Sequence, residues 1–327
     1  MEYVELGSTG IEVSRMCLGT AFRSGLDEDT CVAALEEAEA LGCNFLDCAN
    51  VYRDGFSERA VGRFLCGRRD RMILTTKVGA QAGGGPSGGG LVPDAIMRSV
   101  EDSLRRLGTD RLDLYLCHFP DPVTPLEETL KAMDQLVAQG KVRFVGCSNF
   151  ESWRLCEALH MLLDAGLRPL ACNEVCYSML DRRIEHELLP YAKAQKVSIT
   201  VYAATAIGLL AGRCRYGHPP PEGTSWHRGP YNYRRAMTPH AGNVIDAVIE
   251  TAGRYGKTPA QVAMAWCLRD DGVTSVITGA DTPQRVRENF AAVGWKLADE
   301  DLQMLERVSE GHCLQIHKDC PDGYAGN

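Results

Sequence analysis

Short apolar runs alternate with amphipathic segments along almost the whole chain. The amphipathic segments place apolar residues at three- and four-residue steps, as at Met97, Val100, Leu104 and Leu107, and this spacing predicts helices with one buried face. Alternation of this kind is typical of β-α units that build a parallel sheet. Eight apolar runs are predicted to be strands: "RMCLGT", "CNFLDCA", "RMILTTKVG", "LDLYLCHFP", "VRFVGCSN", "PLACNEVCY", "VSITVYAA" and "TSVITGA".

Eight β-α units without a linker match the number of strands at which a parallel sheet closes into a barrel. We therefore predict an α/β fold of the (β/α)8 TIM-barrel class. It forms one domain over residues 1–327, with the barrel at about 14–294 and a C-terminal helix and tail at 295–327. The rival is an open doubly wound sheet, which would normally carry a G-x-G-x-x-G turn after its first strand. No such turn follows "RMCLGT".

Two segments rich in glycine interrupt the repeating pattern. Residues 1–14 are predicted to form a β-hairpin, with Gly7 and Gly10 flanking its turn, that lies across the bottom of the barrel. The glycine run at 83–90 lacks the spacing of a phosphate-binding turn and is predicted to be a loop at the C-terminal end of the third strand. A flexible, solvent-exposed loop without a binding role is the favoured interpretation, and a substrate lid is the alternative.

The long connection at about 209–239 contains proline, glycine and aromatic residues. Such content suits a structured loop on the C-terminal face better than a linker between domains. Trp226, Tyr231 and Tyr233 are therefore candidates to line a substrate pocket, with surface packing as the alternative.

Charge and composition exclude several classes of function. The formal net charge is −8, and no dense Lys/Arg run is present, so no nucleic-acid partner is expected. The first residues lack the pattern of a secretory signal, and no apolar run reaches the length of a membrane span. We expect a soluble, cytoplasmic protein without a membrane partner that acts on a small molecule. The sequence leaves its oligomeric state open.

The 14 cysteines are scattered singly, without a C-x-x-C pair, and are interpreted as reduced core thiols. In the tail, His312, Cys313, His317 and Cys320 lie close together in sequence, which makes zinc binding an alternative there. An irregular tail with incidental thiols is favoured, so no metal is predicted.

Polar residues stand at the ends of three neighbouring predicted strands. Asp47, Lys77 and His118 end the second, third and fourth runs, and Tyr52 follows Asp47 in the connecting loop. In an α/β barrel, catalytic groups lie at the C-terminal ends of the strands. Each residue alone has a structural interpretation, but together they form a plausible acid-base unit.

A tyrosine phenol has a pKa near ~10, and a nearby ammonium group favours its ionised form. Lys77 could supply this charge, while Asp47 would keep the buried ammonium paired. His118 would orient a substrate oxygen, so that Tyr52 can donate or accept the proton. No side chain provides hydride, and a cofactor is therefore required.

The chain resembles the aldo-keto reductase superfamily through "DCANVY", "SERAVGRFL", "TTK", "LYLCHFPD", "GKVRFVGCSNF", "YAATAIGLLAGR" and "ITGADTPQRVREN", from about residue 6 to residue 310. This resemblance implies that Tyr52 is the general acid, that Lys77 and Asp47 tune it, and that His118 orients the substrate beside it. It also implies an extended nicotinamide cofactor across the mouth of the barrel.

The same resemblance assigns the cofactor contacts. Ser148 and Asn149 match the pair that holds the carboxamide, and Tyr202 matches the aromatic residue that stacks on the nicotinamide. Arg285 is the candidate for a 2′-phosphate, because a guanidinium matches that group in charge and geometry, so NADP is the first choice. The remaining implied cofactor residues are Gly19, Thr20, Asp47, Glu174, Gly208, Leu210, Gly279, Asp281, Glu288 and Asn289.

Three departures from the family pattern bear on cofactor binding. Glu174 stands where the family usually has glutamine, and a carboxylate cannot donate to an amide oxygen. Residues 203–205 replace the more common Ser-Pro-Leu, so a hydroxyl on the pyrophosphate side is absent or displaced. Asp281 would oppose a 2′-phosphate and could accept from ribose hydroxyls, which keeps NAD as the alternative.

The resemblance implies an NAD(P)-dependent oxidoreductase that acts on an aldehyde, ketone or sugar, with Tyr52 and His118 facing the substrate. One alternative is a keto or enoyl reductase of nucleotide-linked sugars. Another is a cofactor-sensing regulatory subunit, because "YNYRRAMTP" and "KTPAQVAMAWCLR" also resemble potassium-channel β subunits. Cys48 and Cys117 adjoin the candidate site, where packing is favoured over oxidation sensitivity because neighbouring strand residues point to opposite faces.

Overall fold

The computed structural model describes residues 1–23, 25–80 and 90–311, and only the backbone of Pro230 and Tyr231. Most of the glycine run at 83–90 and the whole His/Cys tail lie outside the described residues, so the interpretations given for them stay predictions.

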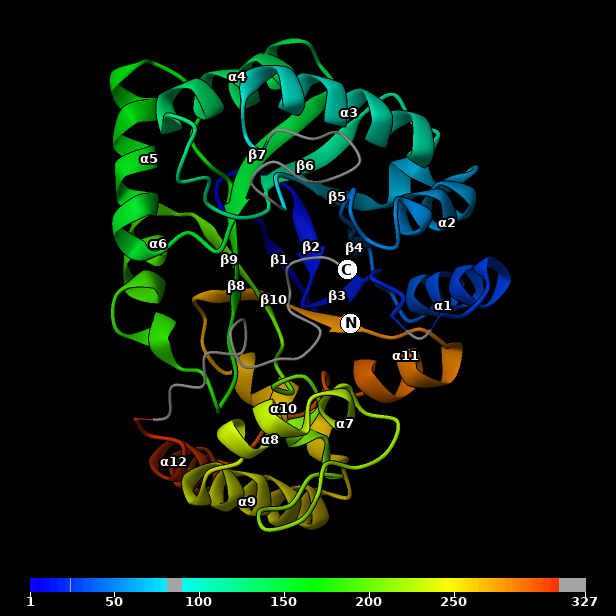
Figure 1. Cartoon of the computed structure of the whole chain (residues 1–327), viewed down its shortest axis with the longest axis vertical. Coiled ribbons are helices and arrows are strands. Elements are labelled where there is room, and N and C mark those ends of the chain that lie inside the picture. The colour runs from blue at the N-terminus through cyan, green and yellow to red at the C-terminus, as the bar shows by residue number, and fades with distance from the viewer. Residues whose placement is uncertain (24, 81–89, 312–327) are drawn as a thin grey trace.

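Eight parallel strands form a closed barrel at the centre of the molecule (Figure 1). Seven of the eight predicted runs contain one of these strands, the eighth covers all of β10 except Val273, and the predicted (β/α)8 barrel is confirmed. Their order around the barrel is β10-β3-β4-β5-β6-β7-β8-β9. The strands are β3 (Met16–Gly19), β4 (Phe45–Asp47), β5 (Ile73–Val78), β6 (Leu112–Cys117), β7 (Val142–Ser148), β8 (Cys172–Cys176), β9 (Ser198–Tyr202) and β10 (Val273–Gly279).

Helices surround the barrel (Figure 1). The predicted helical spacing from Met97 to Leu107 is confirmed, because these residues lie in α3. Three helices begin with a Thr-Pro pair, at Thr238, Thr258 and Thr282, where the threonine side chain accepts from a backbone N–H of the first turn. The helices are α1 (Glu28–Ala40), α2 (Phe56–Leu65), α3 (Pro93–Leu107), α4 (Leu126–Ala138), α5 (Ser152–Asp164), α6 (Leu188–Gln195), α7 (Ser225–Arg228), α8 (Pro230–Ala236), α9 (Pro239–Tyr255), α10 (Pro259–Cys267), α11 (Pro283–Phe290) and α12 (Asp299–Val308).

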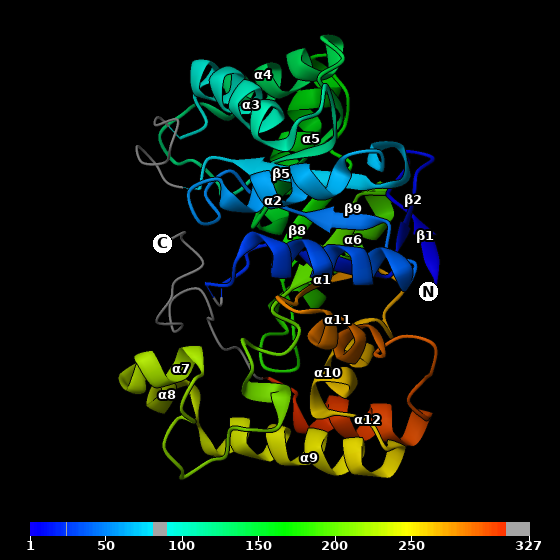
Figure 2. The same cartoon turned by 90° about the vertical axis from the view of Figure 1, so that its right-hand side faces the viewer.

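The predicted N-terminal hairpin is confirmed as β1 (Tyr3–Glu5) paired antiparallel with β2 (Glu12–Ser14). Figure 2 shows it at the right-hand end of the barrel, at the side from which the strands start. Leu6 and Val13 are fully buried there against a small apolar cluster that includes Phe45 of β4. Gly7 has a φ of +58° and lies so close to backbone that a Cβ atom would come within 2.8 Å of the Ala171 oxygen. The hairpin therefore closes the bottom of the barrel, as predicted.

The long connection after β9 is structured. It contains a 3-10 helix, η3 (Leu209–Ala211), followed by α7 and α8. Trp226 in α7 is fully buried, and its indole N–H donates to the backbone oxygen of Ile207 at 3.2 Å. Tyr233 in α8 is also buried and donates to the backbone oxygen of Arg215 at 3.3 Å. These aromatic side chains hold the connection together. Among the described residues, the helices are too short or too polar to cross a membrane.

Candidate active site

The C-terminal ends of β4 and β5 bring the first two predicted catalytic residues into direct contact. Asp47 is the last residue of β4, and Lys77 is the next-to-last residue of β5. The Lys77 ammonium group is fully buried, donates to Asp47 Oδ1 and donates to the backbone oxygen of Cys48 at 3.0 Å. A buried ammonium group needs such partners, so this end of the barrel fixes the lysine in position.

A second carboxyl group reaches the same ammonium group from across the barrel. Glu174 of β8 is buried, and its Oε2 lies 3.3 Å from Lys77 Nζ. Burial by itself lowers the pKa of Lys77, but Asp47, Glu174 and Tyr52 together raise it well above its ordinary value. Lys77 is therefore a permanent cation near neutral pH. The sequence assigned Glu174 to cofactor binding and did not predict its contact with Lys77.

Tyr52 lies in the loop after β4, at the same end of the barrel. Its backbone N–H donates to the Ala49 oxygen at 3.1 Å, which fixes a turn directly after the strand. Its ring is partly exposed. Lys77 Nζ lies 5.4 Å from the centroid of this ring, and the centroid of the His118 ring lies 5.8 Å from it. The predicted catalytic residues Asp47, Tyr52, Lys77 and His118 thus form one cluster.

His118 directly follows β6 and is held by a backbone hydrogen bond from its N–H to the Val78 oxygen at 2.7 Å. Burial, aided by the positive charge of Lys77, lowers the pKa of His118 well below its ordinary value. The imidazole is therefore neutral at pH 7. Its Nδ1 atom is buried and lacks a hydrogen-bond partner among the described residues. Phe119 stacks on the ring at a centroid distance of 4.9 Å and restricts its orientation.

Ser148, Asn149 and Tyr202 form a hydrogen-bonded group beside this cluster. The Asn149 amide nitrogen donates to the His118 backbone oxygen at 3.0 Å, and its Oδ1 accepts from the Tyr202 hydroxyl at 2.7 Å. Ser148 donates to the backbone oxygen of Glu174 at 2.9 Å. Asn149 has a φ of +62°, a left-handed conformation that asparagine tolerates better than most residues. The three residues that the resemblance assigns to the nicotinamide end are therefore adjacent to the acid-base cluster.

Two glycines, one after β9 and one at the end of β10, face open space on the same side of the barrel. A Cβ atom at Gly208 or at Gly279 would meet no atom within 4 Å, so the backbone is accessible at both positions. Asn289 of α11 donates to Thr278 Oγ1 at 2.9 Å and to the Gly279 oxygen at 3.3 Å, and ties the helix to the end of β10. An extended dinucleotide fits this pattern, because its phosphates need a close approach to backbone.

The other predicted cofactor residues differ widely in exposure. Thr20 is fully buried, donates to the Asp47 backbone oxygen at 2.9 Å and lies under the cluster with Gly19. Arg285 and Glu288 are exposed on α11, whereas Asp281 is buried just before that helix. Leu210 is fully buried in η3. Nothing in these contacts tests the role of any one of them toward a cofactor, and those roles stay predictions.

Comparison with known proteins agrees with this geometry. A sequence model described as the Aldo/keto reductase family matches residues 15–310. The chain belongs to the aldo/keto reductase family. Similar proteins include "Aldo-keto reductase YhdN" of Bacillus subtilis (strain 168), which is 32% identical over 320 residues that cover 95% of this chain and 94% of that protein.

Two further relatives of this aldo/keto reductase carry more specific names. The "NADH-specific methylglyoxal reductase" of Escherichia coli (strain K12) is 31% identical, over 95% of this chain and 99% of that protein. A "Probable voltage-gated potassium channel subunit beta" of Oryza sativa subsp. japonica is 30% identical, over 90% of this chain and 91% of that protein. The family therefore includes both oxidoreductases and proteins named as channel subunits.

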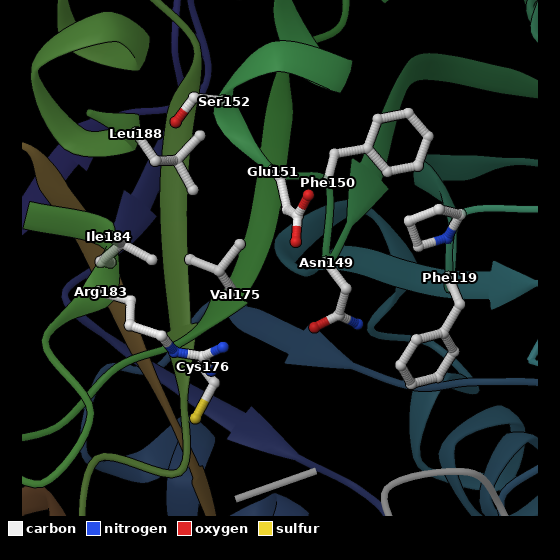
Figure 3. A pocket seen from close by; sticks show the side chains of 11 residues that line it. Phe119, Asn149, Phe150, Glu151, Ser152, Val175, Cys176, Arg183, Ile184 and Leu188 are labelled. Atoms are coloured by element: carbon white, nitrogen blue, oxygen red, sulfur yellow. The ribbon is translucent and has the colours of Figure 1, made fainter. Parts of the chain in front are cut away.

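A pocket of about 400 Å³ opens beside the cluster of this family member (Figure 3). Phe119, which stacks on His118, lies on one side, and the polar ends of Asn149, Glu151 and Arg183 turn toward the same space. Its lining comes from the end of β8, from the segments that follow β6, β7 and β8, and from the first residues of α5 and α6: Phe119, Pro120, Asn149, Phe150, Glu151, Ser152, Val175, Cys176, Arg183, Ile184 and Leu188.

Sequence reasoning missed this pocket, apart from Asn149. The pocket lining does not include Trp226, which packs inside the long connection, and the side chain of Tyr231 lies outside the described part of the chain. The substrate roles predicted for these two residues stay predictions. The only sequence signal for the pocket was its position, since loops that follow barrel strands carry the binding residues in this fold.

Cys48 and Cys117 are buried, and burial raises the pKa of each thiol to about 12. Both are therefore packing residues, as favoured from the alternation of strand positions. Among the described residues, the His, Cys, Asp and Glu side chains form no group of three or more suited to a metal ion.

Proposed function

We propose that this chain is an NAD(P)-dependent oxidoreductase that reduces a carbonyl compound to an alcohol, or runs the reverse reaction. The observation that carries this proposal is the cluster at the C-terminal ends of β4, β5 and β6. There a permanent ammonium group and a neutral imidazole flank a partly exposed phenol.

The phenol of Tyr52 is the proton donor in reduction and the proton acceptor in oxidation. The positive charge of Lys77 attracts a phenolate at Tyr52, and the same attraction contributes to the raised pKa of Lys77. The neutral imidazole of His118 has one N–H to donate to the substrate oxygen beside the phenol. Two donors aimed at one carbonyl oxygen polarise it toward the alkoxide that reduction creates.

Ser148, Asn149 and Tyr202 would hold the nicotinamide end of the cofactor, and the open backbone at Gly208 and Gly279 would lie along its phosphates. When bound, a reduced nicotinamide supplies the hydride that no side chain can supply. Lys77 and His118 are buried, so the two groups that flank the phenol are shielded from water.

The pocket next to His118 would receive the body of the substrate. Val175, Ile184 and Leu188 give it an apolar wall, while Arg183 and Glu151 stand where polar groups can be recognised. An aldehyde or ketone with an apolar body fits this lining. NADPH is the cofactor we propose first, because Arg285 is exposed on α11, where its guanidinium group can contact the 2′-phosphate. NADH is the alternative, supported by the buried carboxylate of Asp281.

The Tyr52→Phe variant tests the proposed function. Removing the hydroxyl should lower turnover by about 10²-fold or more, the usual contribution of a general acid, and should leave cofactor affinity nearly unchanged. The measurement is the oxidation of NADPH and NADH with a panel of aldehydes, ketones and free sugars, beside a fluorescence titration of cofactor binding. Turnover equal to that of the wild type would refute the role of Tyr52.

A regulatory role like that named for the channel-subunit relatives is the alternative. It would be favoured if the wild-type chain bound the cofactor but oxidised none of it with any carbonyl compound. Retention of all four residues of the acid-base cluster supports turnover.

A further inference from the structure

The acid-base cluster contains more carboxyl groups than cations. The single ammonium group of Lys77 lies between Asp47, to which it donates a hydrogen bond, and Glu174, whose Oε2 is 3.3 Å away. All three side chains are buried, with Lys77 fully so. The two carboxyl groups therefore share one buried cation.

Two ionised carboxylates beside one ammonium group would leave a net charge of −1 in a buried site, which is costly without a second cation. One proton on this pair of carboxyl groups removes the imbalance. Burial raises the pKa of both carboxyl groups, and that of Glu174 reaches about 8.

The other titratable groups that face Glu174 do not change this balance. Cys17 of β3 and Cys172 of β8 are buried thiols whose pKa values are raised by burial and by Glu174, so both are neutral. His118 is neutral as well, and Tyr52 is a phenol. Lys77 is therefore the cation that Asp47 and Glu174 compete for.

We propose that Glu174 carries a proton in the working enzyme, and that this proton leaves the charge of Lys77 free to act on Tyr52. The proposal rests on the proposed function for its catalytic consequence. A protonated carboxyl group has one O–H donor and one carbonyl acceptor, which resembles the amide that the family usually has at this position. When Glu174 ionises, Lys77 is neutralised by two carboxylates, and Tyr52 becomes a weaker acid. Glu174 is a positioning residue, because it acts through Lys77.

A measurement on the protein without cofactor tests the proton directly. Because the pKa of Glu174 in the folded chain is above its ordinary value of 4.5, the folded state binds more protons than the unfolded state between that value and about 8. The resulting stability is present at low pH and is lost as pH rises through the folded value. The unfolding midpoint of the wild type should therefore fall, relative to that of Glu174→Gln, between about pH 5 and about pH 8.

The matched control is Glu58→Gln. Glu58 is also fully buried, but its carboxylate is paired with Arg106 at 2.6 Å and accepts from Thr76 at 2.7 Å. Its replacement should change the unfolding midpoint without producing a pH-dependent difference from the wild type between about pH 5 and about pH 8. A difference between wild type and Glu174→Gln that is constant over this range would overturn the proposal.

The pH profile of turnover tests the consequence for Tyr52. Between about pH 7 and about pH 9, carbonyl reduction by the wild type should fall roughly tenfold further than reduction by Glu174→Gln, because glutamine stays neutral. If turnover fell equally with rising pH in the two proteins, Glu174 would not act on Tyr52. If neither protein reduces any carbonyl, the proposed function fails, but the unfolding midpoints still decide whether Glu174 holds the proton.

Discussion

The two ends of the barrel each bury an ionic cluster, and the two clusters have opposite balances of charge. At the bottom, Asp113 near the start of β6 is 2% exposed and has two cationic partners, Arg69 at 2.7 Å and Arg143 at 2.9 Å. It also accepts from the backbone N–H of Leu74 at 3.0 Å. At the top, one cation, Lys77, serves two carboxyl groups.

The difference separates a structural cluster from a reactive one. At the bottom, the carboxylate of Asp113 pairs with two guanidinium groups and accepts from a backbone N–H. At the top, two carboxyl groups share one cation, and His118 Nδ1 has no partner among the described residues. Incomplete pairing costs stability and leaves groups that can exchange protons.

Removing the carboxylate at the bottom should have the largest effect on stability. Asp113→Asn leaves Arg69 and Arg143 without their shared anion, which should cost about 3 kcal/mol, the lower end for a buried pair, because Arg143 is half-exposed. Denaturant unfolding measures the loss, and turnover per folded molecule should remain. The control is Asp110→Asn, because Asp110 is exposed beside Arg111 and its ion pair contributes little. If both variants lost the same free energy of unfolding, the cluster around Asp113 would be no more important for stability than a surface ion pair.

A smaller effect is expected from an exposed cation at the mouth of the barrel. Arg285→Ala should weaken NADPH binding about tenfold, the cost of one charge-assisted contact to phosphate, and should leave NADH binding unchanged. Arg287→Ala is the control, since Arg287 lies on the same helix and pairs with Glu37 of α1 at 2.6 Å. Parallel fluorescence titrations with both cofactors measure this. Equal weakening for NADPH and NADH would show that Arg285 does not recognise the 2′-phosphate.

The sequence was sufficient for the barrel and for the placement of most of the cluster. The strand ends are recognisable because the apolar runs end at a polar residue, as at Asp47, Lys77 and His118. Parallel strands then bring these ends to one face of the barrel without any further information.

The contact between Glu174 and Lys77 could not be predicted in this way. It joins β8 to β5, which are not neighbours in the barrel, and depends on side chains that cross its interior. The pocket could not be predicted from the sequence either. Phe119, Glu151 and Arg183 come from three connecting segments whose conformations the sequence pattern does not specify. Trp226 illustrates the same limit, since aromatic residues in a loop serve packing as readily as binding.

The most direct test of the central claim is the ionisation of Tyr52 with and without the Lys77 ammonium group. Phenolate absorbance is followed during an alkaline titration of the wild type and of Lys77→Met, and the Tyr52→Phe version of each serves as the blank that isolates Tyr52. The account predicts that the Tyr52 phenolate forms at lower pH in the wild type than in Lys77→Met. Ionisation at the same pH in both proteins, with the fold intact by circular dichroism, would contradict it.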